Sequence, residues 1–184
     1  MILYSQALYR WCEPLLWPFE RRVPFREQAG AAPGAGARVD VVMIGLGRYG
    51  RSLAHGLEQR GLAVLGVDVD PEAVRARRAL GKPALYGDAA DPGLTAELPL
   101  EPPPWVVIAI PPHPTGLSHA DPRRALLHAL RERGATKVGV IARDEVEAAE
   151  LERGGAALVL QPFPDAAVRA VERITEELAV RPEP

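Results

Sequence analysis

The chain has 184 residues, of which 47% are hydrophobic and 25% charged, a balance close to that of average soluble globular proteins. This length allows one domain of ordinary size with an appendage and a substantial buried core. The formal net charge of -2 argues against broad electrostatic attraction to nucleic acid or anionic lipid. The single cysteine, Cys12, excludes an internal disulfide and a cysteine-based metal cage, and no apolar run reaches the roughly 18 residues that span a bilayer.

The N-terminal segment differs in composition from the rest of the chain. Residues 1–28 are rich in Trp, Tyr and Phe, and Glu27–Arg38, "EQAGAAPGAGAR", has the small residues, Gly and Pro of a flexible linker. Early prolines and charges make this segment a poor signal peptide. We therefore divide the chain into residues 1–37, an aromatic-rich segment with its linker, and residues 38–181, a single domain. The aromatic side chains fit a membrane interface and equally a contact with the domain or a dimer partner.

Strands and helices are predicted to alternate after the linker. The predicted strands are Val39–Ile44, Ala63–Asp68, Ala84–Tyr86, Trp105–Ile110, Lys137–Ala142 and Ala157–Gln161. The predicted helices are Arg48–Arg60, Pro71–Leu80, a short one within residues 91–98, Asp121–Arg133, Asp144–Arg153 and Asp165–Val180. This alternation predicts an α/β fold: a Rossmann-like doubly wound parallel β-sheet with helices on both faces, plus an N-terminal helical or linker segment.

The motif "GLGRYG", Gly45–Gly50, follows the first strand and opens a helix. Its first glycine allows a tight turn, its second lets the backbone approach a pyrophosphate, and its third lets the helix pack against the sheet. Asp68 ends the second strand, where an acid is expected to accept hydrogen bonds from ribose hydroxyls. A carboxylate there repels a ribose 2′-phosphate, so the sequence favours NAD(H) or an adenosine mono-, di- or triphosphate over NADP(H). Arg75, Arg77 and Arg78 would complicate this preference if they faced the ligand, but an exposed helical face is the simpler interpretation for them.

Several kinds of catalytic chemistry have no motif in the chain. There is no GxxxxGK[ST] phosphate loop, no HExxH zinc pair and no GxSxG elbow. His113 and His119 flank the loop after the fourth strand, where an acid–base or metal role is conceivable but a polar loop is the simpler interpretation. His55 and His128 are expected to face solvent or a half-packed surface from their helices.

From about Arg38 to Leu178 the chain resembles an RCK domain (regulator of potassium conductance, also called the TrkA N-terminal domain). The matching segments are "VVMIGLGRYGRSLAHGLEQRGLAVLGVDVDPE", "ALYGDAADP", "WVVIAI" and "KVGVIARDEVEAAELERGGAALVL". The "YGDA" and "ARD" sequences are more specific to the family than the glycines. The N-terminal "MILYSQALYRWCEPLLWPFERR" resembles the segment that joins the membrane part of Kef-type monovalent cation:proton antiporters to their cytosolic RCK domain.

The resemblance implies a regulatory domain that is not an enzyme. Such domains bind NAD(H), AMP, ADP or ATP, pair through the helix after strand 5 and a final crossover helix, and gate ion flux by changing shape. For this chain the resemblance implies a cytoplasmic homodimer at the inner face of the membrane, partnered with a cation/proton antiporter or potassium channel subunit and not with nucleic acid. It assigns no catalytic residue and no metal ligand. The residues it assigns to the nucleotide site are Gly45, Leu46, Gly47, Arg48, Tyr49, Gly50, Asp68, Val69, Asp88, Ala89, Ala109, Ile110 and Arg143.

Within that set, the resemblance places Asp88 and Ala89 beside the adenine, Ala109 and Ile110 along the ribose, and Arg143 toward the ligand cleft. One departure from the family pattern is the Pro-rich exit from the fourth strand, "PPHPTGLSHADP". A nicotinamide would lie across that loop, so a plain adenine nucleotide is a rival to NAD. Two other functions stay open: an NAD-dependent oxidoreductase that uses His113 or His119, and an interaction module whose Rossmann scaffold has lost its ligand.

Overall fold

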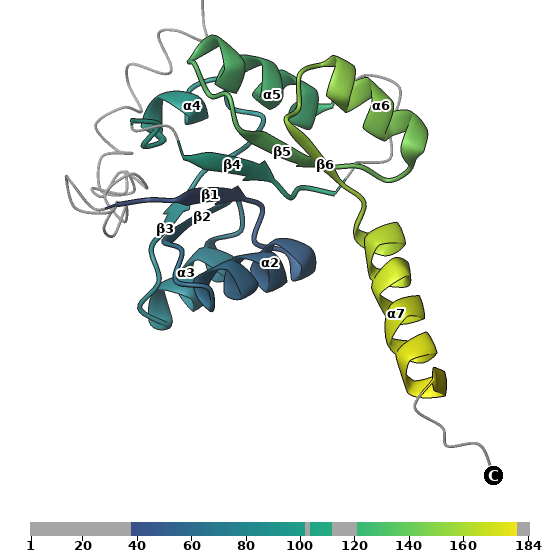
Figure 1. Cartoon of the computed structure of the whole chain (residues 1–184). Helices are drawn as coiled ribbons and strands as arrows, with labels where there is room; N and C mark the ends of the chain where they lie inside the picture. The colour runs from purple at the N-terminus through teal and green to yellow at the C-terminus, as the bar shows by residue number, and fades with distance from the viewer. Residues whose placement is uncertain (1–37, 102–103, 112–120, 180–184) are drawn as a thin grey trace, which may run out of the picture. The chain divides into compact units, whose positions relative to one another are not determined.

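The computed structural model describes residues 38–101, 104–111 and 121–179 (Figure 1). Its centre is a six-stranded parallel sheet with the order β3-β2-β1-β4-β5-β6. The strands are β1 (Val41–Ile44), β2 (Val64–Asp68), β3 (Ala84–Tyr86), β4 (Trp105–Ile108), β5 (Val138–Ile141) and β6 (Leu158–Leu160). The helices are α2 (Arg48–Glu58), α3 (Pro71–Ala79), α4 (Leu94–Glu97), α5 (Pro122–Glu132), α6 (Glu145–Arg153) and α7 (Pro162–Ala179). The predicted α/β class is confirmed, and the expected N-terminal helical or linker segment lies outside the described residues.

Both faces of the sheet are buried under helices. Alternate residues of a strand point to opposite faces, so Val41 and Met43 of β1 belong to one hydrophobic cluster and Val42 and Ile44 to another. Figure 1 shows α2 and α3 on one face of the sheet and α4, α5 and α6 on the other. This double burial explains why the central strands are continuous apolar runs rather than alternating ones.

The predicted strands and helices are all present, and their ends differ from prediction by at most three residues. β1 begins at Val41 rather than Val39, and β4 ends at Ile108 rather than Ile110. Beyond β4 the pairing continues for one bond, from the Ala109 N–H to the Ile44 carbonyl at 2.7 Å. The chain therefore leaves the sheet edge at the same level as the turn that follows β1.

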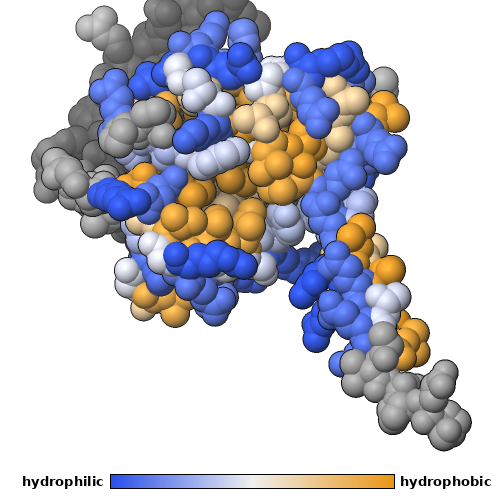
Figure 2. Space-filling model, in the orientation of Figure 1, coloured by the Kyte–Doolittle hydropathy of each residue, from blue (hydrophilic) through white to orange (hydrophobic). Residues whose placement is uncertain are grey.

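The final helix begins earlier than predicted. α7 starts at Pro162 and not at Asp165. Two prolines fit its first turn because N–H groups at that position have no intrahelical acceptor to lose. All side chains at positions 163–178 are exposed. Figure 2 shows hydrophobic residues along one side of α7 and hydrophilic residues along the other; the large hydrophobic ones are Phe163, Val168, Val171, Ile174 and Leu178. Of the helices in the described ranges, none combines the length and the apolar character needed to cross a bilayer.

The prediction for the arginines of α3 was wrong in part. Arg75 is exposed, but Arg77 is largely buried and donates to Glu58 Oε1 at 2.7 Å, to the Val64 carbonyl at 2.6 Å and to the Pro83 carbonyl at 3.1 Å. Arg78 donates to the Ala84 carbonyl. The two guanidinium groups donate to backbone carbonyls at the amino ends of β2 and β3. These hydrogen bonds explain why both arginine side chains fold inward.

Candidate nucleotide-binding site

Three glycines shape the turn between β1 and α2. Gly45 has a positive φ of 98°, and a Cβ there would lie 2.9 Å from the Ala109 carbonyl carbon. A Cβ on Gly50 would lie 1.9 Å from the Gly45 oxygen, so α2 can approach the turn this closely only with glycine. Gly47, by contrast, is exposed, and a Cβ there would have no neighbour within 4 Å. The turn is packed against β4 on one side and open at Gly47.

The start of α2 lacks the cap that α3, α5 and α6 carry. Each of those helices follows an aspartate whose carboxylate accepts a backbone N–H of the first turn: Asp70, Asp121 and Asp144. α2 follows Gly47, which has no side chain to do this, and no acid lies in its first turn. The Arg51 N–H donates to the Gly47 carbonyl at 2.9 Å, and the N–H groups before it have no acceptor within the helix. Such a helix start favours an anion through its N–H groups and its dipole.

Asp68 lies beside this turn at the end of β2. Its Oδ2 accepts the Leu46 N–H at 2.5 Å, and its Oδ1 accepts the Asp70 N–H at 2.7 Å. Each carboxylate oxygen has a further lone pair, so the group can still accept bonds from two ligand hydroxyls. Asp68 is half-buried, whereas Val69 after it is 53% exposed. Two backbone N–H groups therefore fix the carboxylate, and its remaining lone pairs are available to a ligand.

The ends of four strands bring the remaining predicted residues to one edge of the sheet. The Gly45 N–H donates to the Val67 carbonyl at 2.8 Å, and the Gly87 N–H donates to the Asp68 carbonyl at 3.0 Å. Between β1 and β4 the strand order changes direction. In open α/β sheets, ligands bind outside the carboxyl ends of the strands at such a switch point. The glycine turn lies at this point, with Ala109 against it.

The comparison with known sequences gives the family. The sequence pattern of the TrkA-N domain matches residues 41–162. The chain belongs to the TrkA-N domain family. It is 28% identical over 137 residues to the Ktr system potassium uptake protein A of Vibrio alginolyticus, an alignment that covers 73% of this chain and 59% of that protein. The chain thus spans less than two thirds of this relative, and the expected resemblance to an RCK domain is confirmed.

Two solved structures share the fold of this TrkA-N domain. The NAD(P)-binding domain of an exopolyphosphatase-related protein from Archaeoglobus fulgidus has a TM-score of 0.63 and 26% identity, over 76% of this chain and 99% of that one. The Kef CTD of Shewanella denitrificans, in its AMP-bound form, has a TM-score of 0.58 and 22% identity, over 77% of this chain and 81% of that one.

The predicted adenine-side residues lie in the turn after β3 of the TrkA-N domain. Asp88 is exposed, and its Oδ1 accepts the Ala90 N–H at 2.9 Å. Ala89 is partly buried against the core cluster under α4 and α5, as is Ile110 after β4. The side chain of Ile110 also comes close to the glycine turn, since its Cγ1 would lie 3.2 Å from a Cβ on Gly45. Asp88 thus shapes its own turn, while Ile110 packs against the glycine turn.

Arg143, at the end of β5, is exposed and forms an ion pair with Asp144 at 3.2 Å. Its backbone N–H donates to Glu147 Oε2 at 2.6 Å, which fixes the main chain there. The structure therefore anchors the backbone of this predicted site residue, and its guanidinium pairs with the adjacent aspartate.

A buried arginine beside Arg143 is a feature that sequence analysis missed. Arg123 is 2% exposed; it donates twice to Asp121, at 3.0 and 2.6 Å, once to the Ile141 carbonyl at 2.9 Å, and also to Glu147. Burial opposes ionisation of Asp121, but the Arg123 hydrogen bonds outweigh it and lower the pKa of that carboxyl. The network joins the starts of α5 and α6 to the end of β5. No local motif marks it, because its partners come from three elements.

Of the remaining candidate residues, some lie among the described residues and some outside them. Tyr49 is half-buried, and it packs with Leu160 against the hydrophobic cluster under α2 and α3. His55 and His128 are exposed on their helices, as expected. His113 and His119 lie outside the described residues. The described candidates are thus the start of α2, which could hold a phosphate, and Asp68, which could hold a ribose.

Proposed function

We propose that this TrkA-N domain is a regulatory nucleotide sensor. It binds NAD(H) or an adenine nucleotide, with the phosphates at the start of α2 and a ribose at Asp68. Binding changes the conformation of a dimer, and this change regulates potassium or monovalent cation/proton transport. The observation that carries the proposal is the uncapped, open start of α2 beside a fixed carboxylate. The same residues would hold AMP, ADP, ATP or the adenosine half of NAD(H).

The charge of Asp68 supports the choice of nucleotide. A ribose 2′-hydroxyl can donate a hydrogen bond to the carboxylate, whereas a 2′-phosphate would be repelled by it. AMP, which is bound in the Kef CTD structure, has this free hydroxyl and a single phosphate. The site therefore suits NAD(H) and adenine nucleotides better than NADP(H).

The exposed apolar side of α7 supports a dimer. A row of large hydrophobic residues on a helix is normally covered by a partner, since exposed apolar patches mark interaction sites. α6 adds the exposed Val146. A second copy of the chain that packs on α7 would bury these residues, and it would place the partner at the helix that directly follows the sheet.

A regulatory role requires no chemistry at the site. We therefore propose that the domain makes and breaks no bond, as expected for a relative of potassium uptake proteins. The similarity to a potassium uptake protein supports the further proposal that the domain partners a membrane transporter at the inner face of the membrane. The oxidoreductase and the ligand-free module remain the alternatives that the first experiment separates.

The test is isothermal titration calorimetry with NADH, NAD, AMP, ADP and ATP, on the wild type and on Asp68→Asn. The asparagine keeps an acceptor for one backbone N–H but removes the charge. Loss of one charged hydrogen bond to the ribose predicts about tenfold weaker binding. Glu152→Gln, at an exposed position of α6, is the matched control and should bind like the wild type.

The outcomes separate the three functions. Binding that weakens only in Asp68→Asn supports the sensor, and the tightest ligand identifies the signal. Hydride exchange from NADH to a substrate in a parallel screen would instead favour the oxidoreductase. If none of the five nucleotides binds the wild type, the glycine turn is a scaffold and the interaction module is the better description.

A further inference from the structure

The start of α7 and the glycine turn pack against the same part of the core. Tyr49, in the first turn of α2, and Leu160, two residues before α7, both lie against the cluster that contains Met43, Ala109 and Ile141. The Ala142 N–H donates to the Leu160 carbonyl at 2.8 Å, so the main chain is still tied to the sheet there. The first turn of α2 and the segment that leads into α7 are thus anchored to the same cluster.

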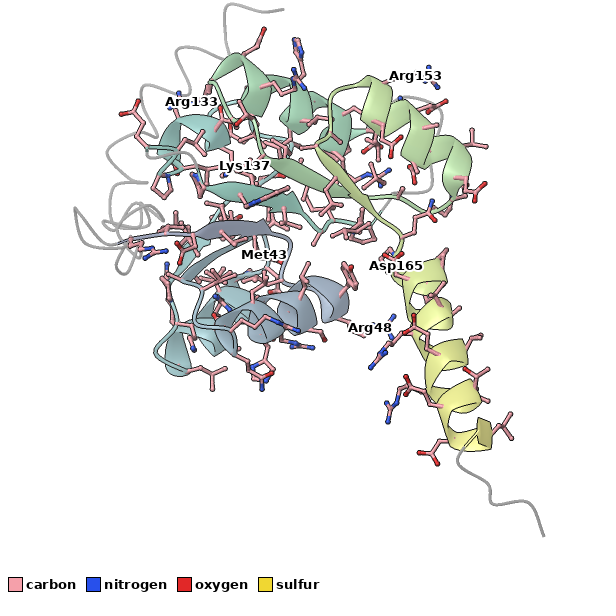
Figure 3. The ribbon with its side chains drawn as sticks, viewed as in Figure 1. Met43, Arg48, Arg133, Lys137, Arg153 and Asp165 are labelled. Carbon is pink, nitrogen blue, oxygen red and sulfur yellow. The ribbon has the colours of Figure 1, made fainter. Side chains whose placement is uncertain are left out.

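Asp165 brings a negative charge to this place. Its Oδ2 accepts the Gln161 N–H at 3.0 Å, and its N–H donates to the Gln161 carbonyl at 2.9 Å, so it closes the first turn of α7. It is exposed, and within the described ranges it forms no ion pair. Figure 3 shows Asp165 at the start of α7 and Arg48 at the start of α2 in the same region of the molecule.

The charge of Asp165 reaches the glycine turn. Burial raises the pKa of the Tyr49 phenol, and the negative charge of Asp165 raises it further. A charge that opposes a phenolate on Tyr49 also opposes a phosphate bound to the neighbouring N–H groups. Arg48 and Arg51, both exposed, are the described cations of the same helix turn.

We propose that Asp165 is a specificity residue of the phosphate site, one that penalises each added phosphate charge and couples phosphate occupancy to the first turn of α7. The proposal rests on the nucleotide-binding function proposed above. This repulsion is reciprocal. If Asp165 weakens phosphate binding by a given free energy, bound phosphate destabilises the first turn of α7 by the same free energy. The proposed dimer helix therefore responds to the phosphate charge of the ligand, and adenosine alone leaves it unchanged.

The test compares adenosine, AMP and ADP on the wild type and on Asp165→Asn by calorimetry at low and high salt. Asparagine retains the oxygen that accepts the Gln161 N–H, so the helix start stays capped. One unit charge near a solvated site predicts about three- to tenfold tighter ADP binding in the variant, a smaller gain for AMP, none for adenosine, and a weaker effect at high salt. Glu176→Gln makes the same change of charge roughly 16 Å further along α7 and should leave all three affinities unchanged.

A second readout needs no nucleotide. Titration of the Tyr49 phenol, assigned by comparison with Tyr49→Phe, should give a lower pKa in Asp165→Asn than in the wild type and no change in Glu176→Gln. Unchanged ADP affinity, or equal tightening for adenosine and ADP, would overturn the role of Asp165 while leaving the sensor intact. Failure of all nucleotides to bind the wild type would overturn both the sensor and this specificity role, and the titration would then show only whether the charge reaches the turn.

Discussion

At the scale of single residues, glycine is required where two pieces of backbone meet. In Gly50→Ala the new Cβ would stand 1.9 Å from the Gly45 oxygen, so α2 must move away from the turn. We expect a loss of about 1–3 kcal/mol in the free energy of unfolding, as for other overpacked sites, and more than tenfold weaker nucleotide binding. Urea unfolding and calorimetry measure the two effects.

The matched control for this variant is on the same helix. A Cβ on Gly56 would meet only the end of Arg60, at 3.8 Å, which is an ordinary contact. Gly56→Ala should therefore raise stability by about 0.5–1 kcal/mol, because alanine is the better helix former. If both variants behaved alike, close packing of the turn would not be the reason for Gly50.

At the scale of elements, the Arg123 network decides how α5, α6 and β5 fit together. Arg123→Met would leave Glu147 buried without its cation, and we expect it to cost about 3–5 kcal/mol in the free energy of unfolding. Arg124→Met removes an exposed partner of Glu150 on the same helix and should cost less than about 1 kcal/mol. Thermal and urea unfolding compare the two, and similar losses would show that burial of the charge is not what matters.

The same network makes a prediction about acid. The pKa of Asp121 is lowered in the folded state, so its stabilisation is present above its ordinary pKa of about 4 and is lost as pH falls through the lowered folded value. In Arg123→Met the side-chain bonds that lower this pKa are gone, and only the backbone N–H of residue 123 and the charge of Arg124 still lower it. The stability of the variant should therefore fall less steeply with acid than that of the wild type.

These elements also show what sequence could and could not predict. The strands and the glycine turn were predicted because each depends on a few neighbouring residues. The inward arginines were not, since Arg77 binds carbonyls 6 and 13 residues away and Arg123 binds a carboxylate 24 residues away. The early start of α7 was missed because proline more often ends a helix than continues one, although Pro162 and Pro164 both fit a first helical turn.

At the scale of the whole molecule, sensing requires that the nucleotide distinguish two states of the proposed dimer. A ligand with equal affinity for both states shifts nothing, however tightly it binds. If the monomer and the dimer are the states in question, nucleotide should change the dimer dissociation constant by about 5–150-fold, the range of typical allosteric couplings. Sedimentation equilibrium with and without ADP or NADH measures this directly.

The exposed side of α7 supplies the control for this last prediction. Ile174→Asp should dissociate the dimer by placing a carboxylate in the apolar row, while Arg173→Asp adds the same group on the neighbouring, polar side and should not. Reciprocity then requires that the nucleotide affinity of Ile174→Asp equal that of the wild-type monomer and be independent of protein concentration. The wild-type dimer could instead bind nucleotide and keep the same dissociation constant with and without it. The signal would then be a conformational change within the dimer, and the nucleotide would not control dimer dissociation.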